Sequence, residues 1–542
     1  MPDRMASLNQ HLICANAITG SSTMGNGRLI RSMAAVSQLL KTRAFAPLLV
    51  ILVLMTSVGA VLAAGAVWSR PDESTHPALT LPPLKQVQAT GQIKEFELDV
   101  GRTGWELAPG KTVDAYAYNG QVPGPELRVT EGDTVRVTVK NALQEPTTVH
   151  WHGVEVPVGM DGVLGLSQAP IQPGDTFTYE FVAIPAGTRW YHAHANELAQ
   201  QGGGLVGALI IEPRDPQPQS ARPDREFTLV SGEWVTSSTT APTGPMLMPT
   251  PGSAGGMDSM MGQGAGPMAQ GVGRLNYDTF TLNGKTYSAA PPLMVRQGER
   301  VRLRLINANA TDTQIFALPG HRLSVTHTDG NVLQQPVQVE AVPLGVGERA
   351  DVEFVADNPG RWQLEAFMPA LSSQGEVVPL SDIVYEGHEA DAAQDFAPDA
   401  QVRIASYANF GGPPHPDPPD RVYELTLSGG VMMGMGSPTN WTINGKNYPN
   451  TDPLEVHLGQ RVRLKLLNMS MEDHPMHLHG HTFQVVAANG RAIDGPLKDT
   501  LTVRHMEQYE IEFVADNPGD WLFHCHNLVH MGGGLMTEIH YR

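Results

Sequence analysis

The chain has 542 residues, enough for about three domains of ordinary size, and 41% of them are hydrophobic and 17% charged. Its 56 glycines and 43 prolines indicate a turn-rich, all-β protein and disfavour a helical bundle or a disordered chain. The formal net charge of −19 disfavours nucleic acid as a partner, because a negative protein repels the phosphate backbone.

Residues 44–68 are almost entirely apolar and follow basic residues at Arg28, Lys41 and Arg43. Such a run is typical of an export signal, and it is also long enough to anchor a chain in a membrane. A buried core helix is the alternative, which Pro47 disfavours. We therefore expect residues 1–66 to be an N-terminal extension with a signal peptide or a transmembrane anchor. The body of the chain would then lie outside the cytoplasm, in the periplasm, secreted, or on the outer face of the plasma membrane.

The body of the chain repeats one unit three times. Each unit begins with Asn-Gly, at Asn119, Asn283 and Asn444, continues through an alternating strand and ends on Glu-Phe-Val and a tryptophan. Period-two alternation bounded by turns is typical of antiparallel strands. The sequence predicts three tandem β-sandwich or barrel domains, over residues 84–213, 227–385 and 402–542. Within the second, the Gly-, Pro- and Met-rich residues 240–273 predict a long mobile loop.

Histidines gather in four short strings in the first and third units. The strings are His150-Trp-His152, His192-Ala-His194, His474-Pro-Met-His477-Leu-His479, and His524-Cys525-His526 followed by His530. On a strand, residues i and i+2 face the same side, so each His-x-His pair presents two imidazoles together. One such pair is more often an ordinary core or surface feature, but four pairs predict a shared metal site. Eight neutral nitrogens suit copper, iron, nickel or zinc.

The sequence holds only two cysteines, Cys14 and Cys525, and we expect no structural disulfide because Cys14 lies in the N-terminal extension. Cys525 would face the opposite side from both of its histidine neighbours and therefore belong to a separate site. Together with His474 and His530 it makes the His₂Cys set of a blue-copper centre. Zinc binds the same set, but zinc would not explain why the thiolate is joined covalently to two ligands of a second site.

In their order and spacing these strings resemble those of the three-domain multicopper oxidases, the family of laccases and bacterial copper-efflux oxidases, over residues 96–542. The resemblance implies cupredoxin-like Greek-key domains, four copper ions, and O₂ and a one-electron reductant as reactants. Electrons would pass from a type 1 copper through the cysteine to a trinuclear cluster that reduces O₂ to water, and the middle domain would be structural. The implied ligands are His474, Cys525 and His530 for type 1 copper, His150 and His477 for type 2, and His152, His192, His194, His479, His524 and His526 for the type 3 pair.

Three further positions follow from the same resemblance. Asp161 matches the acid that relays protons beside the type 2 copper, although Met-Asp-Gly is also a common turn sequence. Relatives often carry an acid directly after the last type 1 histidine, where this chain has Met531. Leu535 stands ten residues after the cysteine, where bacterial relatives place an axial methionine, so we expect a non-coordinating axial residue. Met536 is the alternative if the strand is shifted by one residue.

The choice of reductant depends on methionines. The predicted loop contains Met246, Met248, Met257, Met260, Met261 and Met268, and a second string holds Met432, Met433 and Met435. Soft thioethers select Cu(I), so Cu(I) is the favoured substrate, with a role in copper tolerance and homeostasis. Methionine as filler in a Gly-rich loop, a laccase acting on phenols, and a non-catalytic copper-binding envelope protein are the alternatives. The last is disfavoured because no cluster ligand is missing.

Overall fold

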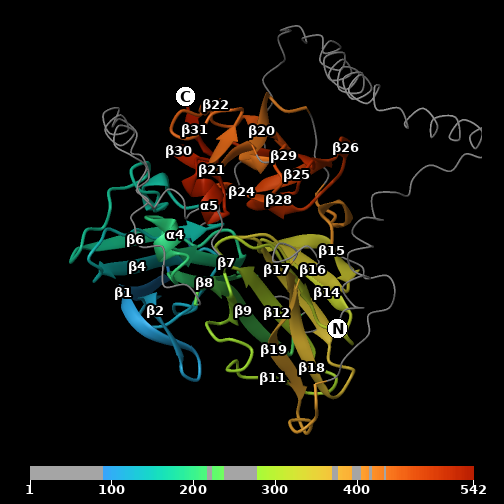
Figure 1. The fold of residues 1–542 in the computed structure, drawn as a ribbon. Helices are drawn as coiled ribbons and strands as arrows, with labels where there is room; N and C mark the ends of the chain where they lie inside the picture. Colours follow the sequence, from blue (N-terminus) through green and yellow to red (C-terminus); the bar gives the residue numbers. More distant parts are fainter. Residues whose placement is uncertain are drawn as a thin grey trace, which may run out of the picture. The chain divides into compact units, whose positions relative to one another are not determined.

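The computed structural model describes residues 89–215, 222–236, 277–368, 376–393, 405–413, 418–432 and 435–542. These residues form six β-sheets joined by loops and very short helices (Figure 1). The prediction of an all-β fold is therefore confirmed. The expected signal or anchor at 44–68 and the methionine-rich loop at 240–273 lie outside the described residues, as do the side chains of the second methionine string. Within the described ranges, no helix is long and apolar enough to cross a membrane.

Each repeat contributes two sheets. The first forms β2-β1-β4-β6 and β3-β8-β7-β5, from β1 (Ile93–Ala108), β2 (Lys111–Tyr118), β3 (Leu127–Thr130), β4 (Thr134–Asn141), β5 (His150–His152), β6 (Thr176–Val182), β7 (Gly187–His192) and β8 (Val206–Glu212). The second forms β10-β9-β12-β17-β14-β15 and β11-β19-β18-β13-β16, from β9 (Arg225–Trp234), β10 (Thr279–Leu282), β11 (Leu293–Val295), β12 (Arg300–Asn307), β13 (Gln314–Ala317), β14 (Leu323–Thr328), β15 (Asn331–Val339), β16 (Ala341–Leu344), β17 (Arg349–Val355), β18 (Arg361–Met368) and β19 (Glu376–Tyr385).

The third repeat forms β21-β20-β23-β29-β25-β26, with β27 beside β25, and β22-β31-β30-β24-β28. Its strands are β20 (Arg421–Met432), β21 (Met435–Ile443), β22 (Leu454–Val456), β23 (Arg461–Asn468), β24 (His474–Leu478), β25 (Phe483–Ala488), β26 (Arg491–Ala492), β27 (Leu497–Lys498), β28 (Thr500–Val503), β29 (Gln508–Val514), β30 (Asp520–Cys525) and β31 (Met536–Tyr541). The short helices are α4 (Glu197–Gln200), α5 (Leu528–Gly532) and the 3₁₀ turns Val158–Met160 and Tyr407–Asn409.

The three repeats share one topology. In the first sheet of each, the strand that starts a hairpin pairs in parallel with the next long strand: β1 with β4, β9 with β12, and β20 with β23. In the second sheets, β3, β11 and β22 pair in parallel with β8, β19 and β31. It follows that β5, β13 and β24 are equivalent strands, and that β7, β18 and β30 are their equivalent partners.

Alternating residues in the repeated strand build the cores. In β23, Val462, Leu464 and Leu466 are fully buried, whereas Arg463 lies on the outer face and pairs with Glu512 of β29. This is the period-two pattern expected of a sheet with one buried face. The sequence alternation therefore sets which side of each sheet packs inward.

The tryptophans that end the second and third repeats have the same structural role. Trp362 Nε1 donates to Asn358 O at 2.8 Å, and Trp521 Nε1 donates to Asn517 O at 2.7 Å. A Cβ at Gly480 (φ +65°) would lie 2.4 Å from the Trp521 ring. Only glycine fits there, so the ring packs directly on the turn that follows β24 and helps to fix that turn.

Candidate metal centre

The histidine strings lie on equivalent strand pairs of the first and third repeats. His150 of β5 is directly opposite His192 of β7, and His477 of β24 is directly opposite His524 of β30. The equivalent strands β13 and β18 of the middle repeat contain no histidine. The sheet register thus places two sets of imidazoles in matching positions of two domains.

These side chains assemble into buried groups whose nitrogen and sulfur atoms lie within 4.8 Å of one another. Cys525 falls into a different group from either of its neighbours in the chain. Among the described residues the groups are His474 with Cys525 and His530, His152 with His192 and His526, His194 with His479 and His524, His150 with His477 and His479, and His152 with His477 and Asp499.

The Cys525 group has the spacing of a trigonal metal site. Its sulfur lies 3.7 Å from His474 Nδ1 and 3.6 Å from His530 Nδ1, and the two nitrogens are 3.0 Å apart. Ligands about 2.3 Å (sulfur) and about 2.0 Å (nitrogen) from one ion, at about 120°, would put sulfur and nitrogen about 3.7 Å apart. Burial raises the pKa of the Cys525 thiol well above its ordinary value, so a metal ion entering this group must displace the thiol proton.

The outer nitrogens of this group point in different directions. His474 Nε2 is 2.7 Å from Ser470 Oγ, a buried hydroxyl. His530 Nε2 is 3.0 Å from Glu472 Oε2, and the Glu472 side chain is 58% exposed. The edge of His530 is therefore the connection between this group and the surface.

The remaining groups bring bare imidazole nitrogens together. The Nε2 atoms of His150 and His477 are 3.4 Å apart, and those of His479 and His524 are 3.0 Å apart. Two nitrogens that bind one ion at a tetrahedral angle are about 3.3 Å apart. Neutral imidazoles that face each other in this way have the spacing of shared metal ligands.

The donor set fits copper ions. Burial, with repulsion from neighbouring imidazoles, lowers the pKa of His477, His479 and His524 well below the ordinary value, so their lone pairs are free. The Nε2 atoms of His192 and His526 are buried and have no hydrogen-bond partner. Leaving such an atom unpaired costs about 1–3 kcal/mol, a cost that coordination removes. Neutral imidazoles with one thiolate are ligands typical of copper.

Asp161 lies between two of these groups. Its main-chain oxygen accepts a hydrogen bond from His150 Nδ1 at 2.8 Å, and its Oδ2 accepts one from His479 Nδ1 at 2.9 Å. The other carboxylate oxygen, Oδ1, is buried and lies 3.2 Å from His150 Nδ1 without forming a hydrogen bond. At the position where relatives often have an acid, Met531 is buried beside Leu522 and Met536, so an apolar contact replaces the acid there.

The middle repeat also reaches the histidines, which the sequence did not indicate. Arg349 of β17 has its Nη1 3.3 Å from His152 Nδ1 and forms two hydrogen bonds to Asp499, of 2.6 and 2.5 Å. Asp499 in turn accepts a hydrogen bond from His477 Nδ1 on its main-chain oxygen, at 2.9 Å. At Gly347 (φ +86°), an added Cβ would lie 3.0 Å from the His526 ring. This segment therefore covers one side of the site.

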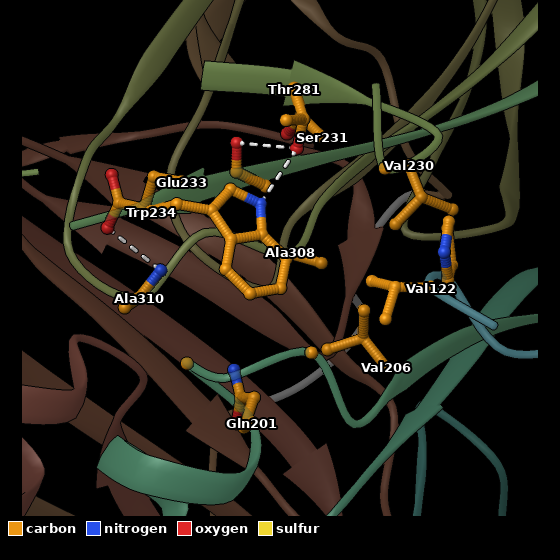
Figure 2. A pocket seen from close by; sticks show the side chains of 15 residues that line it. Val122, Gln201, Val206, Val230, Ser231, Glu233, Trp234, Thr281, Ala308 and Ala310 are labelled. Carbon is orange, nitrogen blue, oxygen red and sulfur yellow. Dashed lines mark hydrogen bonds between the residues drawn. The ribbon is translucent and has the colours of Figure 1, made fainter. Parts of the chain in front are cut away.

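A carboxylate of the middle repeat, Glu233, supports the α5 segment. Glu233 borders a cavity of about 20 Å³, room for about one water, and accepts a hydrogen bond from Ala310 N at 2.9 Å (Figure 2). It also accepts one from Thr311 N, at 2.6 Å. The carbonyl oxygens of these two residues accept hydrogen bonds from Leu528 N at 2.9 Å and Asn527 Nδ2 at 3.1 Å. The loop between His526 and His530 is thus held by the middle repeat.

The sequence of this chain matches those of known copper enzymes. Tandem cupredoxin-like domains that share buried histidine groups define a copper-binding oxidoreductase. Sequence profiles of multicopper oxidases match residues 99–216, 256–387 and 419–542. The chain is 34% identical to multicopper oxidase MmcO of Mycobacterium tuberculosis, over 84% of this chain and 87% of that protein. It is 27% identical to copper resistance protein A of Escherichia coli, over 87% of this chain and 95% of that protein.

Solved structures of multicopper oxidases have a similar fold. The multicopper oxidase of Pseudomonas thermotolerans matches with a TM-score of 0.63 and 29% identity, over 83% of this chain and 99% of that one. The multicopper oxidase of Campylobacter jejuni, described as a metallo-oxidase, matches with a TM-score of 0.65 and 25% identity, over 85% of this chain and 94% of that one. The chain belongs to the multicopper oxidase family, oxidoreductases that use oxygen and bind four copper ions. The predictions of family, enzyme class and cofactor are confirmed.

The buried pair Arg349 and Asp499 yields a stability prediction. Asp499→Asn leaves a buried guanidinium without its bidentate partner, and breaking a buried pair in this way costs about 3–5 kcal/mol. We expect the thermal unfolding midpoint of the copper-free protein to fall by several degrees. The matched control is Glu126→Gln, which removes a carboxylate from the exposed pair with Arg128 and should cost less than about 1 kcal/mol. Equal effects of the two substitutions would contradict the role given to the buried pair.

Proposed function

We propose that this enzyme couples the oxidation of Cu(I) to the reduction of O₂ and serves copper tolerance. Four Cu(I) ions each lose one electron, and O₂ takes up these four electrons with four protons to give two waters. The observation that carries the choice of reductant is the contact between Glu472 and His530. An exposed carboxylate bonded to the outer nitrogen of a type 1 ligand offers a cation a binding point at the edge of the electron-accepting site.

The proposed ligands follow the geometric groups. His474, Cys525 and His530 would hold the type 1 copper, and His150 and His477 the type 2 copper. The type 3 pair would be held by two triplets, His152 with His192 and His526, and His194 with His479 and His524. When bound, the coppers supply one-electron transfer and the reduction of O₂.

The chain itself provides the route for electrons. Cys525 is bonded through the backbone to His524 and His526, one from each proposed type 3 triplet. His524 Nδ1 also lies 3.0 Å from the carbonyl oxygen of Cys525. A covalent path with a hydrogen bond beside it joins the two sites without any movement of side chains.

Asp161 is the proposed proton carrier. Its Oδ2 accepts a hydrogen bond from His479, whereas Oδ1 makes no hydrogen bond and lies 3.2 Å from His150 Nδ1, so Oδ1 is the atom proposed to carry the proton. The residue is fully buried beside two histidine groups, and a proton held there would be adjacent to the site of O₂ reduction.

Two methionines close to Glu472 in the sequence support Cu(I) as the substrate. Met469 and Met471 are 38% and 59% exposed, although most methionines described elsewhere in the third repeat are buried. Thioethers beside a carboxylate suit a soft cation. The methionines of the 240–273 segment, from Met246 to Met268, are proposed to add further Cu(I)-binding side chains.

A laccase that acts on phenols is the second candidate. Its support is similarity to proteins named laccase, among them laccase-12 of Arabidopsis thaliana, and the surface connection of His530, which an aromatic reductant could also contact. A non-catalytic copper-binding protein is disfavoured because every ligand position is filled. We further propose that residues 44–68 export the chain or anchor it, so that the enzyme works outside the cytoplasm.

Glu472→Gln separates the two candidate reductants. The amide keeps the shape of the side chain but removes the charge, so kcat/KM for Cu(I) should fall about tenfold, a loss of about 1.4 kcal/mol in transition-state stabilisation. Oxidation of a phenol should change less than about threefold. Oxygen consumption with each reductant measures both. Glu424→Gln, at a carboxylate that is 81% exposed, is the control. A larger loss with the phenol would favour the laccase alternative.

Cys525→Ser tests the proposed electron route. The serine hydroxyl cannot replace the thiolate, so the intense blue absorption should disappear and turnover should fall by several orders of magnitude. Most of the remaining copper should stay bound, because the other groups keep all their histidines. Copper quantitation beside the visible spectrum measures this, and retained turnover would remove Cys525 from the route.

Leu535→Met tests the proposed axial position. Leu535 is fully buried in the cluster that contains Cys525, whereas Met536 packs with Leu522 and Met531. Leu535 N also donates to His530 O at 3.0 Å. A thioether donates electron density and favours Cu(II), so Leu535→Met should lower the reduction potential of the type 1 copper. A potential that shifts with Met536→Leu and not with Leu535→Met would assign the axial position to Met536.

A further inference from the structure

Helix α4 presents a buried carboxylate to one of the proposed type 3 ligands. Glu197 Oε1 lies 3.0 Å from His194 Nδ1, and the side chains are 9% and 0% exposed. In the described part of the chain neither atom has any other partner, and their 3.0 Å approach is a close contact without the angle of a hydrogen bond. A buried carboxylate oxygen next to a buried ring nitrogen is costly unless the two interact with each other.

The Nδ1 atoms of other proposed ligands contact different kinds of group. His192 Nδ1 and His524 Nδ1 each lie 3.0 Å from a main-chain carbonyl oxygen. In the triplet of His194, His479 and His524, two members face carboxylates, Glu197 and Asp161. In the other triplet, His152 Nδ1 has both Arg349 Nη1 at 3.3 Å and Asp499 Oδ1 at 3.5 Å beside it, so the charge there is balanced and the two proposed triplets differ.

We propose that Glu197 is a positioning residue for His194. Its carboxylate holds the Nδ1 proton, which fixes the neutral tautomer that leaves Nε2 free for copper. The negative charge also makes the imidazole a stronger donor. This inference rests on the ligand assignment given under the proposed function, and it adds a carboxylate that the histidine motifs do not contain.

The short helix that carries Glu197 is fixed independently of the histidine. Gln200 accepts a hydrogen bond from Thr147 Oγ1 and donates one to Pro146 O, both at 2.8 Å. A four-residue helix has no stability of its own, so such tertiary bonds hold it in place. These bonds attach the helix to the segment that leads to His150, so the carboxylate is in position before copper binds.

The test compares Glu197→Ala with Glu197→Gln in the full-length holoenzyme. Glu197→Ala should retain copper about 10–100-fold less well against a chelator, through loss at one type 3 position. The blue type 1 absorption should be unchanged, and additional copper should become visible by electron paramagnetic resonance because its coupled partner is lost. Glu197→Gln should largely restore retention, since its amide oxygen accepts the same proton. If the amide also fails with the blue colour intact, the carboxylate charge itself is required, which still supports the role.

Glu145→Gln is the control, because it removes a neighbouring carboxylate that contacts Tyr116 and Asn196 but no histidine. Wild-type copper retention and spin count in Glu197→Ala would overturn the proposal, as would a loss of type 1 colour or a similar loss in the control. If Glu197→Ala does not fold, Glu197→Leu takes its place, because leucine fills the same space but cannot accept the proton. Wild-type copper retention and an unchanged spin signal in Glu197→Leu would then overturn the proposal. None of these readouts uses a reductant, so a failure of Cu(I) as substrate would be seen separately.

Discussion

The structure depends on burying ten histidine side chains where water cannot reach their nitrogens. All ten ligand candidates are at most 1% exposed. Burial lowers the pKa of His477, His479 and His524, and pairs of ring nitrogens face one another at 3.0 and 3.4 Å. Such an arrangement is unfavourable without metal ions, so copper binding and the stability of this region are linked. Only a rigid scaffold can hold it in place before the metal arrives.

Strand geometry provides that scaffold, and it explains why the histidine groups could be predicted. The His-x-His spacing needs only the two-residue period of a strand, and the repeats showed that the strings come from matching positions. His150 opposite His192 and His477 opposite His524 are consequences of that register. The all-β fold and the family followed from the same local patterns.

The supporting charges could not be predicted in this way. Arg349 and Asp499 are 150 residues apart, and each is an ordinary charged residue in its own segment. Glu472 faces a histidine 58 positions away. Glu197 is only three residues from His194, yet the contact depends on the bend before helix α4, where Asn196 has a φ of 51°, and the sequence pattern does not predict that bend. Interactions set by packing leave no periodic signal in a sequence.

The middle repeat shows what such packing achieves. It has the topology of its neighbours but no histidine on β13 or β18, so these two strands supply no imidazole to the metal site. Instead Arg349 contacts the first and third repeats at their shared site, while Glu233 holds the loop that α5 rests on. The two halves of the metal cluster touch directly, as His479 and Asp161 do, and the middle repeat adds a third body that fixes them relative to each other. A buried ion pair suits that task, because its energy depends steeply on geometry even where its net contribution to stability is small.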